Sequence, residues 1–507
     1  MRSSIWFAAA AAVLAAPSVS HAQQTPIDTA TLAPVVVTAT RTDIKPVAPL
    51  ASTTVITGAD LRAQGITTLG DALASVPGVF VPQSGSYGAQ TSLFLRGGES
   101  DYTQVLVDGV PVNDPGGAID LANLTTDNID RIEIVRGPAS VLYGANAVTG
   151  VIQIFTRGGD GPGRVTLGAD GGTYGTSNAS ASFTGGSDKI GGSASIARHR
   201  TDGIYAFNSS SRNDVYSGQL RLTPDAATSV RLMLRDEDAG AHIPTDFSGA
   251  VTDSTQFHLE RRLLASLGAA RRLTDRLTAR VLLGASDEHE QSAQIPRAPG
   301  AQCDLCYDSR AGIYRRSVDA RLEFNAAPWA ALSGGASAEQ QRARESGSGP
   351  LQRTLHAYYA QALGSVGRAF SYTAGVRADD NSQFGTFTTY RLSAGYVLVP
   401  GTSVHASVGN AFREPTFDET SSTASFARGN PNLKPERSRS WEAGVEQDVA
   451  HGAVVLSATY FAQRFRDMIQ YDGTPPDTSL PNYFNLAAAT ADGLEVGART
   501  ATWLGFS

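Results

Sequence analysis

Residues 178–185 read NASASFTG, a stretch in which apolar and hydroxyl side chains alternate. Because successive side chains of an extended strand point to opposite faces, this stretch predicts a strand with one apolar and one polar face. Residues 229–235 (SVRLMLR) and 277–286 (LTARVLLGAS) repeat the alternation, with arginines among the alternate positions. Such strands suit a soluble sandwich, whose apolar faces point inward, and equally a membrane barrel, whose apolar face points to lipid.

The number and spacing of these segments favour the barrel. About 15 to 16 of them fit between residues 163 and 507, spaced as hairpins with short turns on one side and longer loops on the other. The polar stretches 205–214 and 295–312 predict two of the long loops. After the N-terminal segment, no run approaches the roughly 18 apolar residues that a spanning helix needs. The 52 glycines also suit a large β-protein.

The N-terminus has the features of a secretory signal peptide. Arg2 is followed by an apolar run over residues 5–16 and by the sequence SHA at 20–22. Residues 1–22 are therefore expected to be removed, and the mature chain is expected to begin at Gln23.

The chain has two cysteines, Cys303 and Cys306. Export places them in an oxidising compartment, where a disulfide within one loop is permitted. A metal site built on Cys-x-x-Cys would normally need a second pair of ligands, and none stands nearby. We therefore expect a disulfide between Cys303 and Cys306 and no metal site.

Residues 23–44 read as a flexible arm that contains a β-prone stretch. Residues 23–34 are polar and without periodicity, and VVVTAT follows at 35–40. A β-prone stretch on a mobile arm can add as a strand to the sheet edge of another protein. It can also be the first strand of the next domain.

Residues 45–160 predict a small α+β domain. Helix-forming segments at 58–65 and 67–79 come first, and Thr68 and Asp71 are spaced as a capping box. Short β-prone segments separated by glycine-rich turns follow as far as residue 159. The alternating strands begin after this domain.

Several local motifs occur along the chain. They are VVVTA at 35–39, LRGG at 95–98, VDGVPV at 107–112, IDRIEIVRGPASVLYGANAVTGVIQI at 129–154, GNAFREPTFDE at 409–419, GNPNLKPERSRSWEAGVE at 429–446 and GLEVG at 493–497. These motifs and the order of the segments resemble those of the TonB-dependent outer-membrane receptors. The resemblance implies a mainly β fold in which an N-terminal α+β plug domain lies inside a transmembrane antiparallel β-barrel. Full-length barrels of the family have 22 strands. Since residues 161–507 provide about 16, we expect C-terminal strands to be missing.

The resemblance also implies a function and the residues that serve it. The family actively transports large scarce nutrients, so no enzymatic activity and no cofactor are expected. The implied TonB box consists of Val35, Val36, Val37, Thr38 and Ala39. The implied plug-barrel lock consists of Arg96, Arg136, Glu442 and Glu495. The plug residues implied to contact the ligand are Gln83, Ser84, Tyr87, Asn113 and Asp114. The implied partners are TonB with its inner-membrane energising complex, outer-membrane lipid and a small-molecule ligand, and we expect a monomer.

Residues 93–117 bear on the identity of the ligand. They most resemble the cobalamin (vitamin B12) receptor branch, although ferric-siderophore receptors share much of the same sequence. Haem receptors of the family carry a histidine between two barrel motifs, and residues 416–428 contain none. Cobalamin receptors bind calcium through clustered loop aspartates, whereas the acidic residues of 200–217 and 235–240 are fewer and differently spaced. We therefore expect cobalamin first, with a ferric siderophore as the alternative, and solvated loops rather than a calcium site.

Other classes of protein fit the sequence less well. A secreted enzyme on a β scaffold would carry a motif such as G-x-S-x-G or H-E-x-x-H, and neither is present. A passive porin-like barrel would lack the plug motifs. The net charge of −7 and the lack of a Lys/Arg-rich run argue against nucleic acid as a partner.

Overall fold

The computed structural model describes residues 38–42, 46–245, 250–296, 306–327, 329–345, 349–424, 426–449, 453–475, 477, 479–486 and 488–500. The predicted signal peptide, the first three residues of the predicted TonB box (Val35, Val36 and Val37) and Cys303 lie outside these residues. The predicted disulfide with Cys306 therefore stays a prediction. Among the described residues, no helix is both long enough and apolar enough to cross a membrane.

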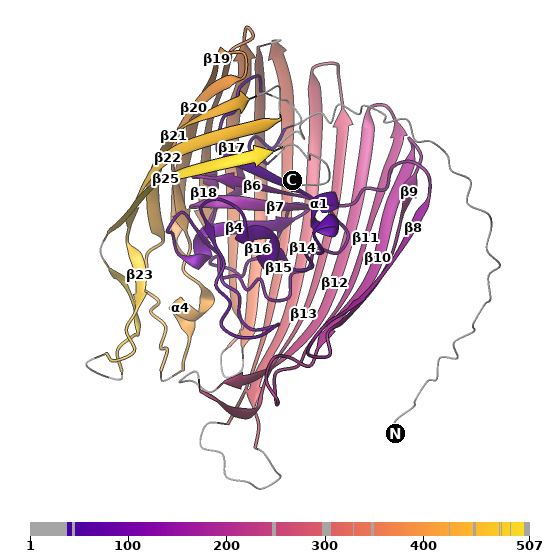
Figure 1. Cartoon of the computed structure of the whole chain (residues 1–507). Coiled ribbons are helices and arrows are strands. Elements are labelled where there is room, and N and C mark those ends of the chain that lie inside the picture. Colours follow the sequence, from indigo (N-terminus) through magenta and orange to yellow (C-terminus); the bar gives the residue numbers. More distant parts are fainter. Residues whose placement is uncertain are drawn as a thin grey trace, which may run out of the picture. The chain divides into compact units, whose positions relative to one another are not determined.

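One antiparallel sheet of 16 strands contains most of the described chain (Figure 1). Its strands are β8 (Arg164–Gly171), β9 (Ser177–Gly186), β10 (Ile190–Thr201), β11 (Ser211–Asp225), β12 (Thr228–Thr245), β13 (Val251–Arg272), β14 (Leu277–Gln294), β15 (Tyr307–Ala327), β16 (Ala330–Glu345), β17 (Leu351–Val366), β18 (Phe370–Asn381), β19 (Gly385–Val399), β20 (Thr402–Arg413), β21 (Glu436–Val449), β22 (Val454–Arg466) and β25 (Ala489–Thr500). Each strand pairs with its neighbour along the chain, and β25 pairs with β22. The predicted number of strands is confirmed. Within the described residues the sheet is open, with β8 and β25 at its two edges.

The large sheet has an apolar outer face and a polar inner face. On β13, Leu263 and Leu267 of the outer face are 41% and 40% exposed, whereas Glu260 and Arg262 of the inner face are 4% and 3% exposed. A soluble sandwich would bury its leucines and expose its charges. The reverse arrangement is typical of a membrane barrel, whose apolar face meets lipid.

The connections between these strands differ at the two ends of the sheet. At one end, which we call the turn end, short connections such as 226–227 and 400–401 join the strands. At the other, which we call the loop end, lie longer connections. The connection 414–435 contains α4 (Phe417–Ser421), and 467–488 contains β23 (Met468–Tyr471) and β24 (Tyr483–Leu486). This is the asymmetry that the sequence predicts.

The elements before β8 form a smaller inner domain. They are β1 (Thr53–Thr57), α1 (Gly58–Ala63), α2 (Leu69–Ala74), β2 (Val79–Phe80), β3 (Phe94–Leu95), the 3₁₀ helix η1 (Ser100–Tyr102), β4 (Thr103–Val107), β5 (Val110–Pro111), β6 (Ile129–Arg136), α3 (Ser140–Tyr143) and β7 (Gly150–Thr156). Five of the strands form a sheet of order β1-β6-β7-β4-β5, in which β4 and β7 are parallel. As the sequence predicts, Thr68 caps α2, because its hydroxyl oxygen accepts from the Asp71 N–H at 3.2 Å.

The inner domain packs against the polar face of the large sheet (Figure 1). Its core includes Leu69, Val105 and Ile152, all of which are 0% exposed. Met233 of β12 and Leu264 of β13 belong to the same apolar cluster. The apolar core of the inner domain is therefore completed by the wall of the large sheet.

Candidate functional site

Arg96 of the inner domain lies at the centre of a buried group of ion pairs. Its Nε and Nη2 donate to the two carboxylate oxygens of Glu495, at 2.9 and 2.6 Å, and its Nη1 donates to Glu442 Oε2 at 2.7 Å. The side chains of Arg96 and Glu442 are each 1% exposed. Burial lowers the pKa of Arg96, but hydrogen bonding and attraction from the two carboxylates outweigh it, so the pKa is raised. Arg96 is thus paired bidentately with one carboxylate and singly with a second.

The backbone around Arg96 is shaped to bring it to the wall of the large sheet. Arg96 has a positive φ of 53°, and its N–H donates to the Gly78 carbonyl at 2.8 Å. Gly78 lies so close to Glu495 that a Cβ there would be 2.0 Å from Oε1. Since Gly78 also has a positive φ of 78°, a side chain at this position would strain the backbone and displace the Glu495 carboxylate. On the other side, the guanidinium lies over the ring of Phe461 on β22, 4.7 Å from its centroid.

Arg136, the last residue of β6, shares Glu495 with Arg96. Its Nε lies 3.3 Å from Glu495 Oε2, and its Nη1 and Nη2 donate to Thr54 Oγ1 at 2.8 and 3.0 Å. Burial, together with the neighbouring Arg96, lowers the pKa of Arg136. Glu442 on β21 also accepts from the Ser52 N–H at 3.2 Å. The structure thus places the four residues of the predicted lock together, with two positive charges facing two negative ones.

Residues 38–42 of the arm lie between the inner domain and the large sheet. Thr38 is 2% exposed, and its N–H and hydroxyl donate to Glu133 Oε2 at 2.8 and 2.7 Å. Its carbonyl accepts from the Tyr143 hydroxyl at 2.9 Å. The Thr40 carbonyl accepts from Gln361 of β17 at 3.1 Å. Of the predicted TonB box, Thr38 is therefore buried, and Ala39 beside it is partly buried.

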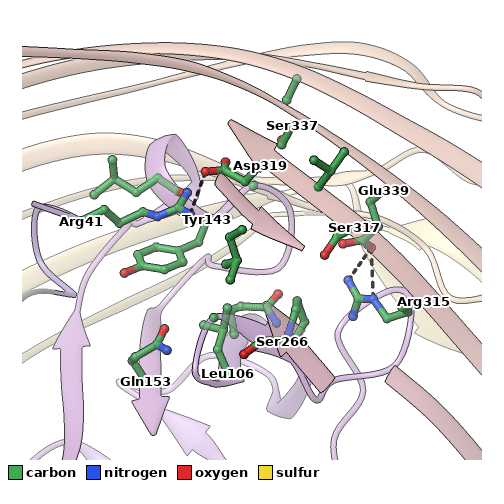
Figure 2. A pocket seen from close by; sticks show the side chains of 18 of the residues that line it. Arg41, Leu106, Tyr143, Gln153, Ser266, Arg315, Ser317, Asp319, Ser337 and Glu339 are labelled. Atoms are coloured by element: carbon green, nitrogen blue, oxygen red, sulfur yellow. Dashed lines mark hydrogen bonds and ion pairs between the residues drawn. The ribbon is translucent and has the colours of Figure 1, made fainter. Parts of the chain in front are cut away.

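Arg41 fastens this segment to the large sheet (Figure 2). Its Nη1 donates to the Leu142 carbonyl at 2.7 Å, and its Nη2 lies 3.3 Å from Asp319 Oδ1 on β15. The guanidinium also lies 5.4 and 6.0 Å from the ring centroids of Tyr143 and Tyr359. The Tyr359 hydroxyl in turn donates to Asp319 Oδ2 at 2.9 Å. Arg41 is a functional candidate that the sequence does not reveal, because its carboxylate partner lies 278 positions away.

A cavity of about 280 Å³ lies beside Arg41, between the inner domain and the large sheet. Leu106 and Gln153 of the inner domain line it together with Ser266, Ser337 and Glu339 of the large sheet, and Ser266 lies beside Leu106 (Figure 2). Arg315 of β15 donates to Glu339 Oε1 at 3.0 and 2.6 Å and also lines the cavity. The lining therefore combines charged and polar side chains with apolar ones, and the arm forms part of it.

The first loop predicted to contact ligand, residues 82–90, lies at the loop end. The Ser86 hydroxyl donates to the carbonyl of Ser209, in the connection between β10 and β11, at 3.4 Å. The predicted contact residues in this loop, Gln83, Ser84 and Tyr87, are all exposed. With 55% of its surface exposed, Tyr87 offers the largest apolar face there.

Asn113, predicted to contact ligand from the second loop, is turned inward instead. Its Oδ1 accepts from the Val105 N–H at 2.7 Å and from Gln104 Nε2 at 3.0 Å. Its Nδ2 donates to the carbonyls of Thr103 and Gly117, at 3.0 and 2.8 Å. Since an amide has two acceptor and two donor positions, no group of this side chain remains for a ligand. At 2% exposure, Asn113 holds the loop in shape.

Asp114 is partly buried and faces charged residues of β13 and β14. Burial, followed by the charge of Glu288, raises the pKa of Asp114 well above its usual range. Possible metal-ligand atoms within 4.8 Å of one another, in the part of the chain that the structure describes, belong to His258, Glu260 and Glu290. Arg262 lies 3.0 Å from Glu260 and 2.6 Å from Glu288, so a guanidinium already supplies positive charge at this place.

We expect Asn113→Ala to destabilise the inner domain. The change would leave buried amide and carbonyl groups without partners, at a cost of about 1–3 kcal/mol. The urea concentration at which a brief protease pulse cleaves the inner domain should fall. Tyr87→Ala, which removes an exposed side chain from the other loop, should leave that concentration unchanged. Equal cleavage of the Asn113→Ala variant and the parent protein would contradict the inward role of this amide.

Known protein families match both parts of the chain. The plug family, described as "TonB-dependent Receptor Plug Domain", matches residues 47–151. The family described as "TonB dependent receptor-like, beta-barrel" matches residues 153–507, which is more than half of the chain. This chain is a TonB-dependent receptor. The inner domain is its plug and the large sheet is its barrel, as the sequence predicts.

Several proteins are similar to this receptor along most of its length. The vitamin B12 transporter BtuB of Vibrio vulnificus (strain YJ016) is 28% identical over 517 residues, which span 98% of this chain and 80% of the relative. The siderophore receptor PirA from Acinetobacter baumannii has a TM-score of 0.70 and 19% identity, covering 89% of this chain and 78% of that one. The ferric citrate transporter FecA in its unliganded form has a TM-score of 0.69 and 20% identity, covering 89% and 75%. At such identities the two structures establish the fold alone.

Membership of the family fixes the class of function. TonB-dependent receptors are outer-membrane proteins of Gram-negative bacteria that transport nutrients, and the family and the relatives of this chain are transporters or receptors rather than enzymes. The plug domain also distinguishes this chain from a passive porin-like barrel.

Proposed function

We propose that this receptor carries cobalamin across the outer membrane by TonB-dependent transport. Two observations support this ligand. The chain is similar to a vitamin B12 transporter along nearly its whole length, and the sequence of residues 93–117 most resembles the cobalamin receptor branch. A ferric siderophore is the second candidate, because siderophore receptors share the plug motifs and the fold. The exposed loop residues Gln83, Ser84 and Tyr87 meet the ligand first.

The buried lock of Arg96, Arg136, Glu442 and Glu495 is the observation that carries the energy-dependent part of the proposal, whereas the choice of ligand rests on the similarity. A plug joined to the wall by ion pairs that are almost inaccessible to water does not leave by thermal motion alone, because separating such a pair exposes uncompensated charge. Passage of a large ligand therefore needs work done on the plug. TonB, energised from the inner membrane, is the source of that work in this family.

The arm transmits the work to the plug. Residues 35–39 pair with TonB as an added strand, and the backbone hydrogen bonds of this strand hold the arm to TonB. Thr38 is bonded to Glu133 and Tyr143 in the structure, so complete pairing requires these bonds to open. Residues 1–22 are removed on export, 23–44 form the arm, 45–160 the plug and 161–507 the barrel. The receptor acts as a monomer in outer-membrane lipid, without a cofactor.

Uptake by cells tests the transport and the ligand together. Cells that lack their own cobalamin and siderophore receptors would express this receptor and be given radiocobalt-labelled cyanocobalamin or radioiron-loaded siderophores. We expect cyanocobalamin to accumulate, and accumulation to stop with a protonophore or with Val37→Pro, since proline removes a backbone donor from the added strand. Leu32→Pro, the same change upstream of the box, should have little effect.

The other outcomes separate the alternatives. Energy-dependent accumulation of iron but not cobalt would assign a siderophore. Accumulation that neither the protonophore nor Val37→Pro reduces would contradict TonB-dependent transport by this chain.

A further inference from the structure

One buried arginine at the end of β20 joins three elements at the loop end. Arg413 is 2% exposed, and its Nε donates to Glu436 Oε2 at 2.7 Å. Its Nη2 donates to Glu419 Oε1 at 2.9 Å, and its Nη1 lies 3.1 Å from Asp101 Oδ2. Glu436 begins β21, Glu419 lies on α4, and Asp101 belongs to η1 of the plug. Arg413 therefore connects two loop-end elements of the barrel with the plug.

The plug loop 113–118 meets the same place. Arg413 Nη1 also donates to the Gly116 carbonyl at 3.1 Å. A Cβ on Gly116 would lie 2.6 Å from Cα of Thr416, the residue that caps α4. Because the plug loop and α4 are in close backbone contact beside Arg413, movement of α4 must disturb the loop, the arginine or both.

The residue before Arg413 leads from this junction to the arm. The Phe412 carbonyl accepts from the Asn146 N–H at 3.0 Å. Three positions before Asn146, Tyr143 holds the Thr38 carbonyl and lies beside Arg41. A short plug segment, residues 140–148, thus contacts the barrel at β20 through Asn146 and the arm through Leu142 and Tyr143. It forms a continuous physical connection between the loop end and the arm.

The charge at the junction makes Arg413 hard to replace. One guanidinium faces the three carboxyl groups of Asp101, Glu419 and Glu436. Burial raises the pKa of Asp101 to about 7, so ionising this group there is costly. Without the guanidinium, the carboxylates would face one another in a poorly hydrated place, where like charges repel strongly.

We propose that Arg413 is a positioning residue that couples the loop end of the barrel to the arm. While its contacts are intact, segment 140–148 keeps Thr38 and Arg41 inside the barrel. A ligand that moves α4 or the plug loop 113–118 disturbs this junction and releases the arm. Binding of the released arm by TonB rests on the proposed function. The coupling itself belongs to the receptor alone and is measurable without TonB or nutrient.

The test is the accessibility of a buried arm residue in outer-membrane fragments. Thr42 is 4% exposed, so a cysteine there reacts with a membrane-impermeant maleimide only when the arm leaves the barrel. Thr42→Cys would be placed in a receptor carrying Cys303→Ser and Cys306→Ser. We expect Arg413→Gln to raise the labelling rate about tenfold, a usual size for coupling between sites. Arg413→Lys, which keeps the charge but not the planar fork, should restore part of the protection.

Two controls make the result specific. Arg437→Gln removes a neighbouring loop-end arginine that is 58% exposed and 3.9 Å from Asp467, and it should leave the labelling rate unchanged. A cysteine replacing Ser333, 9% exposed on β16, should stay equally protected in every variant. The proposal is overturned if Arg413→Gln does not accelerate labelling at residue 42. It is also overturned if Arg437→Gln has the same effect, or if residue 333 becomes accessible in parallel. If the receptor failed to take up cobalamin, these labelling rates would still test the coupling.

Discussion

Arg96→Ala is expected to loosen the plug and to abolish energy-dependent uptake. The change leaves Glu442 and Glu495 buried, with Arg136 reaching only Glu495, at 3.3 Å. Removing one partner of a buried ion pair costs about 3–5 kcal/mol, because the remaining charge is uncompensated. That is a large part of the roughly 5–15 kcal/mol that stabilises a typical domain. We therefore expect a lower urea midpoint for proteolysis of the plug and faster entry of hydrophilic dyes than with the parent receptor.

The control for Arg96→Ala is another plug arginine outside the lock. Arg62 is exposed on α1, where its Nη1 donates to the Ile129 carbonyl at 3.4 Å, so Arg62→Ala should leave the midpoint almost unchanged. Adding Glu442→Gln and Glu495→Gln to Arg96→Ala neutralises the stranded carboxylates and should recover part of the stability, though not the uptake. A plug that resists protease equally with and without Arg96 would show that apolar packing, not the lock, retains it.

The strand pattern was predictable because it is local. Alternation along a strand fixes which side chains share a face, and the exposed Leu263 beside the buried Arg262 follows from that rule alone. The alternation alone does not show whether the apolar face or the polar face of the sheet points inward. The number of strands and the plug motifs indicate a filled barrel, and the buried inner charges agree with it.

The site was predictable only where a motif marks it. Arg96 and Glu495 were found because both lie in recognisable stretches, although 399 positions separate them. Asn113 was predicted to contact the ligand because a polar residue in a glycine-rich loop suggests exposure. The sequence alone does not tell that its side-chain amide forms hydrogen bonds with the backbone of β4. Arg41 was missed for a related reason: the inward face of β15 carries several charged residues, and only the fold shows that Asp319 is its partner.

Arg41→Ala is expected to free the arm without ligand. The change removes the bond to the Leu142 carbonyl, the ion pair with Asp319 and contacts with two tyrosine rings. With the ion pair only 18% and 14% exposed, we estimate a loss of about 2 kcal/mol, roughly thirtyfold in the population of released arm. Labelling of a cysteine at residue 42 should accelerate accordingly, while cleavage of the plug by protease stays unchanged.

A double-mutant cycle with Asp319→Asn decides whether the ion pair itself holds the arm. If it does, Asp319→Asn alone accelerates labelling, and the double variant is scarcely faster than Arg41→Ala, because the interaction is already lost. Arg321→Ala is the matched control, since Arg321 lines the same cavity but pairs with Glu323 at 3.0 Å. Should Asp319→Asn leave the rate at its parent value while Arg41→Ala raises it, the Leu142 carbonyl and the tyrosine rings hold the arm. Release of the arm would then require Arg41 to leave the Leu142 carbonyl and the two tyrosine rings, and the charge of Asp319 on β15 would play no part in it.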